Sequence, residues 1–89
     1  MKLTRKVKVR NALGLHTRPA AAIVKILQPR KSSVSFVCKG ETINARSIMS
    51  ILMLAAQKNT SIEIIIEGVD AEVTMELLVA AFEQEFGEK

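Results

Sequence analysis

The chain has 89 residues, a length that suits one domain with a modest core and excludes two domains. It carries thirteen Lys or Arg against nine Asp or Glu, a net charge of +4, and 48% of its residues are hydrophobic. These apolar residues lie in short groups, with no run near the roughly 20 residues that span a bilayer and no secretory signal at the start. We therefore expect one cytoplasmic domain over residues 1–89, without membrane insertion.

The charges are distributed unevenly along the chain. Residues 1–59 hold twelve Lys or Arg and a single acid, whereas residues 60–89 hold eight acids and one lysine. A basic half can attract nucleic acid, a membrane surface, or acidic and phosphorylated partners. The chain has no Trp or Tyr, and its three Phe fall in core-like patterns, which leaves no platform for stacking bases. Nucleic-acid binding is therefore a weak second interpretation.

The first elements are a strand and a helix. Residues 3–9 alternate between apolar and polar side chains, which predicts a half-buried strand. Pro19 suits the first turn of a helix, so the helix is expected to begin near His16 or Thr17. Its apolar stripe has spacings of three and four residues, and Pro29 ends it.

A hairpin follows the helix. Residues 33–38 alternate, residues 39–41 form a turn, and residues 42–44 return as a short partner strand. Cys38 lies in this apolar segment and is the only cysteine, so an internal disulfide is excluded. We expect a buried, reduced thiol.

A second helix and a fourth strand come next. Ser47 precedes an apolar stripe of helical spacing and is a candidate N-cap, and the helix is expected to end near residues 58–59, where Asn59 can take the left-handed conformation. Isoleucines alternate over residues 62–66 and predict a strand rich in β-branched side chains.

The last element is a helix. Asp70 can cap it, its stripe extends to Phe86, and residues 87–89 are expected to be a frayed tail. Four strands and three helices, in this order and with the helices on one face, predict an open two-layer sandwich of the α+β class.

His16 is the only histidine and lies in a setting that suits an anion. A turn at Gly14 precedes it, and the first turn of the helix, with Pro19, follows, so unpaired amides and a positive dipole are expected beside the ring. Arg18 is two residues away. Both positive features disfavour imidazolium, which predicts a neutral ring with a lone pair free to attack phosphorus. A helix-capping histidine beside an exposed arginine would have the same spacing.

Two motifs resemble one family. Residues 14–20, Gly-Leu-His-Thr-Arg-Pro-Ala, resemble the active-site signature of HPr, the histidine phosphocarrier of the bacterial phosphotransferase system. Residues 46–49, Arg-Ser-Ile-Met, resemble its regulatory serine segment. Length and element order agree over nearly the whole chain, and two motifs in the right order make a chance match far rarer than one.

The resemblance implies a four-stranded antiparallel sheet covered on one face by three helices, an open-faced β-sandwich of order βαββαβα. It implies that His16 accepts a phosphoryl group on its δ nitrogen from enzyme I, which draws on phosphoenolpyruvate, and passes it to enzyme IIA proteins in sugar uptake or its regulation. Arg18 would stabilise the phosphoryl group. The chain would be a monomeric carrier with a phosphohistidine intermediate rather than a stand-alone enzyme, with no metal and no cofactor.

The second motif has a regulatory and a structural interpretation. By resemblance, Ser47 matches the target of a serine kinase and phosphorylase, and Ile48, Met49 and Leu52 match the docking patch for partners. From the residues alone, Ser47 is equally well a plain helix cap, and Met49 and Met53 could fill the core. Flexible apolar side chains off the buried stripe suit varied partners, which favours docking for Met49.

Some features leave alternatives open. Ser50 and Asn59 replace glycines common in sugar-system members, and residues 51–54 resemble the nitrogen-related branch, so a nitrogen-related regulatory phosphorelay remains an alternative to sugar uptake. A small phosphatase or phosphotransferase using His16 would need a second catalytic base or an acidic metal cluster near the motif, and neither is there. A nucleic-acid-binding domain would need exposed aromatics or a Gly-X-X-Gly loop.

Overall fold

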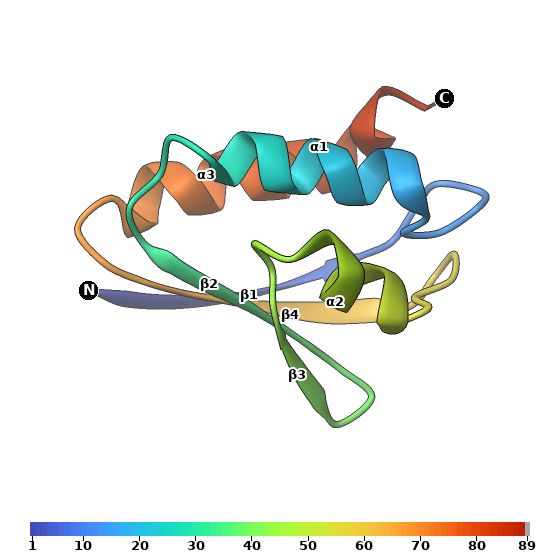
Figure 1. Cartoon of the computed structure of the whole chain (residues 1–89), viewed down its shortest axis with the longest axis horizontal. Coiled ribbons are helices and arrows are strands. Elements are labelled where there is room, and N and C mark those ends of the chain that lie inside the picture. Colours follow the sequence, from blue (N-terminus) through green and yellow to red (C-terminus); the bar gives the residue numbers. More distant parts are fainter. Residues whose placement is uncertain (89) are drawn as a thin grey trace.

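The structure is a computed structural model that describes residues 1–88 (Figure 1). Its elements, in chain order, are β1 (Lys2–Lys8), α1 (Thr17–Leu27), β2 (Ser33–Cys38), β3 (Glu41–Asn44), α2 (Ile48–Met53), β4 (Ser61–Glu67), α3 (Ala71–Glu83) and a short 3-10 helix (Glu85–Gly87). The strands form one antiparallel sheet of order β1-β4-β2-β3, and the helices lie on one face of it. The predicted α+β open-faced sandwich is confirmed.

β4 lies inside the sheet because its sequence suits burial on the helix side. Ile62, Ile64 and Ile66 are fully buried beneath the helices, while the alternate side chains of β4 face the open side of the sheet. β4 pairs with β1 on one side and β2 on the other, so Ile64 lies between Arg5 and Phe36. β1 is an edge strand, and its exposed cations discourage pairing with another chain.

The core lies between the sheet and the helices. The ring of Phe36 from β2 meets the ring of Phe82 from α3 edge-on, with centroids 5.9 Å apart, and both rings are almost fully buried. Ile23 and Leu27 of α1 join them at 0% exposure. Cys38 is free and buried in this core, as its pattern predicted.

The hairpin and the start of α1 agree with the sequence. β2 and β3 are joined by Lys39 and Gly40, which have φ values of 51° and 82°. Two consecutive positive φ angles are typical of the tight turns that match the twist of a hairpin. α1 begins at Thr17 with His16 as its N-cap residue, as predicted, and it ends before Pro29.

The predicted end of the second helix is wrong. α2 ends at Met53, and Ala55 is exposed with φ of 51° instead of continuing the helix to residues 58–59. The chain leaves the helix there because the carbonyl of Ala56 accepts a hydrogen bond from the amide of Leu15 at 2.9 Å. Asn59 does have a left-handed φ of 74°, but in the turn that enters β4.

The predictions for the last helix need two corrections. Asp70 occupies the N-cap position of α3, yet its side chain makes no capping hydrogen bond; its carboxylate instead accepts from the amides of Lys31 and Ser32 at 2.8 and 2.9 Å. α3 ends at Glu83, so Phe86 lies beyond it with φ of 53° and packs on Phe82 at a centroid distance of 5.0 Å.

The tail is folded rather than frayed as far as the structure describes it. Gly87 has φ of 78° and directs Glu88 back toward the loop that follows β1. Lys89 lies outside the described residues.

Candidate functional site

His16 sits where the loop after β1 becomes α1. Its backbone is extended and its carbonyl accepts from the amide of Ala20 at 3.0 Å, but its side chain makes no cap hydrogen bond. The first-turn amides of Thr17 and Arg18 have no carbonyl four residues back within the helix, and Pro19 has no amide. The interpretation of His16 as a capping side chain is therefore wrong, and its half-exposed ring lies beside a positive helix end.

A glycine holds the loop in place. Gly14 has φ of 70°, and a Cβ on it would overlap the carbonyl oxygen of Ala56, so both the conformation and the close approach need glycine. The amide of Leu15 donates to the same carbonyl. Together these contacts hold the loop that carries His16 against the segment that follows α2.

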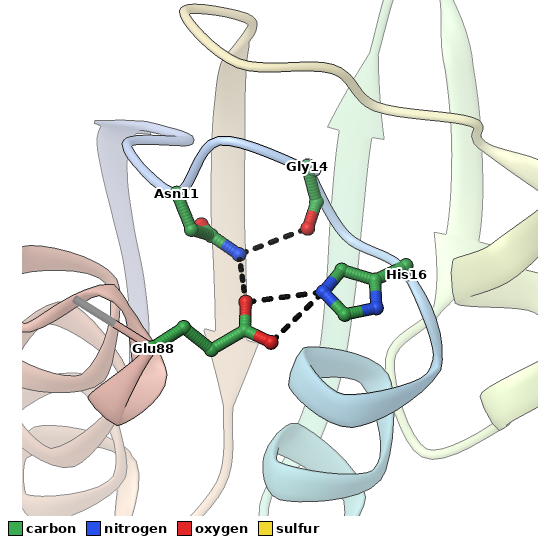
Figure 2. A network of polar contacts seen from close by, with 4 residues as sticks. All are labelled: Asn11, Gly14, His16 and Glu88. Carbon is green, nitrogen blue, oxygen red and sulfur yellow. Dashed lines mark hydrogen bonds and ion pairs between the residues drawn. The ribbon is translucent and has the colours of Figure 1, made fainter.

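A buried asparagine connects the loop to the tail. Asn11 is 2% exposed, and its Nδ2 donates to the carbonyl of Gly14 at 2.9 Å and to Oε1 of Glu88 at 2.8 Å (Figure 2). Both partners only accept, which fixes the orientation of the amide group. Its Oδ1 is buried without a hydrogen-bond partner among residues 1–88.

Glu88 lies directly against the histidine ring. Nε2 of His16 is 2.8 Å from Oε2 and 3.1 Å from Oε1 of Glu88, with 31% of the His16 side chain and 13% of the Glu88 side chain exposed. Figure 2 shows the second ring nitrogen on the side away from the carboxylate, with no contact drawn to it. One nitrogen is thus occupied and the other is free among the residues drawn.

The electrostatics of this contact favour a carboxylate. Burial raises the pKa of Glu88, but the hydrogen bonds from Asn11 and His16 and the attraction of positive charge at Arg18, and at His16 when it is protonated, outweigh burial and leave that pKa below its usual value. Arg18 is exposed on the first turn of α1, and its charge reaches this group.

The second motif, residues 46–49, lies near the C-terminal end of α1, whereas His16 lies at its N-terminal end. Ser47 is the N-cap of α2, with its Oγ accepting from the amide of Ser50 at 3.1 Å, so the predicted cap is confirmed. The preceding Arg46 donates to the carbonyl of Leu27 at the end of α1. Since His16 lies at the start of α1, the structure does not bring Ser47 and His16 together.

The apolar residues of α2 are divided between core and surface. Met49 and Met53 are 69% and 75% exposed, so the alternative that they fill the core is wrong. Ile48 is 41% exposed, whereas Leu52 is half-buried and packs against the core. We call the exposed and half-buried apolar residues of this helix, Ile48, Met49, Leu52 and Met53, the α2 surface. Met53 is three residues before Ala56, and the carbonyl oxygen of Ala56 lies against Gly14 in the loop that carries His16.

Sequence reasoning missed two residues of the site, Asn11 and Glu88. The signals that could have found Glu88 are Phe86, whose aromatic ring anchors the tail, and Gly87, which allows the turn back. For Asn11, the only signal in the sequence is its position just after the predicted strand over residues 3–9.

No three His, Cys, Asp or Glu side chains among residues 1–88 are grouped as metal ligands would be. Within the same range, no helix combines the length and the apolar character needed to cross a membrane.

Comparison with known proteins places the chain in a family. A family model described as the PTS HPr component phosphorylation site matches residues 3–84. Phosphocarrier protein HPr of Chlamydia muridarum is 44% identical over 80 residues, which cover 90% of this chain and 77% of that protein. The HPr of Xylella fastidiosa is 37% identical over 86 residues, 97% of each chain.

A solved structure agrees with this assignment. The crystal structure of HPr-C-His from Thermoanaerobacter tengcongensis superimposes with a TM-score of 0.93 at 31% identity and covers 98% of both chains. The resemblance that the two sequence motifs carried is confirmed. The chain belongs to the HPr family of phosphocarrier proteins of the phosphotransferase system.

Proposed function

We propose that His16 is the residue that carries the phosphoryl group. The observation that carries this proposal is the position of its ring, half-exposed at the positive end of α1 and not used as a cap. The first-turn amides of Thr17 and Arg18, which have no acceptor four residues back in α1, and the guanidinium of Arg18, two residues from His16 in sequence, are groups that suit phosphoryl oxygens. The phosphoryl group comes from enzyme I, charged by phosphoenolpyruvate, and goes to enzyme IIA proteins; the chain acts as a single-domain monomer in the cytoplasm.

Incubation with enzyme I and phosphoenolpyruvate tests this assignment. We expect one phosphoryl adduct on the protein by intact-mass spectrometry, lost in acid and retained in alkali as for phosphohistidine. His16→Ala should take no adduct and should keep its thermal unfolding transition, because the ring is half-exposed and its backbone contacts remain. A full, acid-labile adduct on His16→Ala would overturn the assignment.

The downstream route is tested with acceptors. We propose sugar uptake or its regulation as the role, with transfer to IIA proteins. Phosphorylated protein mixed with purified IIA proteins of the sugar branch and of the nitrogen-related branch should transfer faster to the former. Faster transfer to the nitrogen-related IIA would instead assign the chain to a regulatory phosphorelay.

We further propose that partners dock on the α2 surface and that phosphorylation of Ser47 weakens this docking. Ser47 immediately precedes Ile48, and an apolar surface that is desolvated by a partner disfavours an unpaired charge at its border by several kcal/mol. The neighbouring Arg46 offers no compensation, because its guanidinium already donates to three backbone carbonyls. The helix N-terminus tolerates the charge, so the fold should remain intact.

Two variants distinguish a switch from a cap. Ser47→Asp should bind enzyme I at least about tenfold more weakly, since 1.4 kcal/mol corresponds to a factor of ten, with little change in thermal stability. Ser47→Ala should bind normally. Unchanged affinity of Ser47→Asp for enzyme I would leave Ser47 as a helix cap alone.

A further inference from the structure

We propose that Glu88 is a positioning residue that keeps the Nε2 proton on His16 before and after Nδ1 takes the phosphoryl group. This inference rests on the proposed role of His16 as acceptor. Glu88 lies 72 residues after His16 in sequence, and the fold brings the two side chains together.

The contact itself determines which nitrogen carries the proton. Both oxygens of an ionised carboxylate can only accept, and they lie 2.8 and 3.1 Å from Nε2 of His16. A hydrogen bond over this distance therefore requires the proton on Nε2. In a neutral ring with that proton, Nδ1 has the lone pair. Figure 2 shows Nδ1 on the side of the ring away from Glu88, so the carboxylate does not block it.

Glu88 is itself held in place from two sides. Nδ2 of Asn11 donates to Oε1 of Glu88 at 2.8 Å, and the same nitrogen donates to the carbonyl of Gly14, which fixes its direction. On the other side, Phe86 packs on Phe82 and Gly87 turns the chain back. With 13% of its side chain exposed, Glu88 is a constrained partner rather than a solvated one. Arg18 is the other charged group that acts on it.

This arrangement matches what the transfer step requires. The Nδ1 lone pair forms the bond to phosphorus as the bond between phosphorus and the donor atom of enzyme I breaks, and that bonding pair stays with the donor. The ring, still protonated on Nε2, becomes a positively charged phosphoimidazole, and the carboxylate of Glu88 lies against the new charge. No proton has to leave or arrive.

The same proton assists the return step. When an acceptor attacks phosphorus, the Nδ1–phosphorus bond breaks and its electron pair returns to Nδ1, so a neutral imidazole leaves. If Nε2 had lost its proton, the leaving group would be an imidazolate anion, which leaves far less readily. Glu88 thus keeps the phosphorylated protein ready to donate.

A matched pair of variants isolates this effect. Glu88→Gln removes the carboxylate at the ring, and Glu83→Gln removes a carboxylate from an exposed position near the end of α3. In Glu88→Gln, Asn11 still favours the amide oxygen as its acceptor, which places an NH₂ donor toward Nε2. Glu88→Asp retains the charge on a shorter side chain and should restore part of the wild-type behaviour. Glu88→Ala removes the group altogether and guards against an alternative orientation of the glutamine.

The first readout needs no phosphoryl donor. Long-range ¹⁵N–¹H NMR of neutral His16 should show the proton on Nε2 in the wild type and in Glu83→Gln. In Glu88→Gln and Glu88→Ala a substantial fraction should move to Nδ1. Retention of the Nε2 proton in both Glu88 variants would overturn the proposal.

The second readout is hydrolysis of the phosphorylated protein, prepared with phosphoramidate so that enzyme I is not needed. Hydrolysis should slow as pH rises and Nε2 loses its proton, and without the carboxylate this midpoint should fall by about 1 pH unit or more. Equal midpoints in the wild type, Glu88→Gln and Glu88→Ala would also overturn the proposal. If enzyme I fails to phosphorylate the wild type while both readouts respond as expected, the proposed function fails and the role of Glu88 stands.

Discussion

The two ends of α1 are both held by polar contacts, but they differ in what they leave unpaired. At the C-terminal end, the guanidinium of Arg46 donates to the carbonyls of Leu27, Arg30 and Ser32 at 2.6, 2.8 and 2.6 Å. The carboxylate of Asp70 accepts from the amides of Lys31 and Ser32 and from the hydroxyl of Ser32. The groups that join the segments here are paired, and the one buried side-chain atom near them without a partner among residues 1–88 is Nε of Arg30.

The N-terminal end is less completely paired. Asn11 keeps a buried Oδ1 without a partner among residues 1–88, the first-turn amides lack helical acceptors, and the ring of His16 is half-exposed. Each end therefore has one buried side-chain atom without a partner among residues 1–88, and the difference lies in the exposed imidazole and the first-turn amides, which are open to an incoming group. The comparison indicates that one end of α1 serves stability, whereas the other is open to the chemistry proposed for His16.

Arg46→Ala tests whether the C-terminal end of α1 serves stability. It leaves the carbonyls of Leu27, Arg30 and Ser32 without a charged donor, so we expect a loss of about 3 kcal/mol in the free energy of unfolding. Urea denaturation monitored by circular dichroism measures it, and Arg46→Lys should lose less because it retains one donor group. Phosphoryl acceptance by the folded variant should be unchanged; a slower rate would mean that the two ends are coupled.

The complementary variant is Arg18→Ala at the other end. The side chain is exposed, so we expect little change in stability. Loss of a charge-assisted contact to the phosphoryl group should slow transfer by the equivalent of about 1.5–3 kcal/mol, leaving some acceptance through the helix amides. Rapid-quench kinetics with enzyme I measures this rate. Wild-type kinetics would show that Arg18 is only a solvated surface residue.

A smaller effect is expected at the start of α2. Ser47→Ala removes the hydroxyl that accepts from the amide of Ser50 and should destabilise the fold by roughly 1 kcal/mol. Thermal unfolding by calorimetry gives the value. Ser47→Thr, which keeps a hydroxyl, is the control and should retain most of the stability. If both variants melt like the wild type, the cap contributes nothing.

The smallest effect concerns pH. Hydrogen bonds from Ser32 and Lys31, the former largest, lower the pKa of Asp70 to about 2 against the weaker opposing effect of burial. Because the folded pKa lies below the unfolded one, its contribution to stability is present above about pH 4 and is lost as pH falls toward 2. The melting temperature of Asp70→Asn should thus approach that of the wild type between pH 4 and pH 2. Glu72→Gln, exposed in the first turn of α3, is the control. A difference that stays constant down to pH 2 would contradict the shift.

Local patterns predicted most of the fold. The alternation of β4, the hairpin turn at Lys39 and Gly40 and the start of α1 beside Pro19 each depend on neighbouring residues, and each was confirmed. The end of α2 was not predictable in this way, because Ala56 leaves the helix to pair with Leu15, about forty residues earlier in the chain.

The candidate site was likewise predictable where its signals are local and not where they depend on long-range contacts. The sequence motif located His16 and Arg18, since the helix start beside them is a local signal. It could not locate Glu88 or assign Asp70 its partners, because both carboxylates reach across the fold to residues far away in sequence. Phe86 and Gly87 signal that the tail turns back, but which residues Glu88 and Asp70 meet depends on how α3 packs.

The close approach of Gly14 to Ala56 has a consequence for how partners meet this carrier. It leaves no space for even one methyl group between the loop of His16 and the chain that follows α2. A partner that docked on the α2 surface, as proposed above, would therefore meet the imidazole at a set distance and direction, without a search over loop conformations. Gly14 would in this way give the proposed donor and the proposed acceptor, which bind in turn, the same geometry.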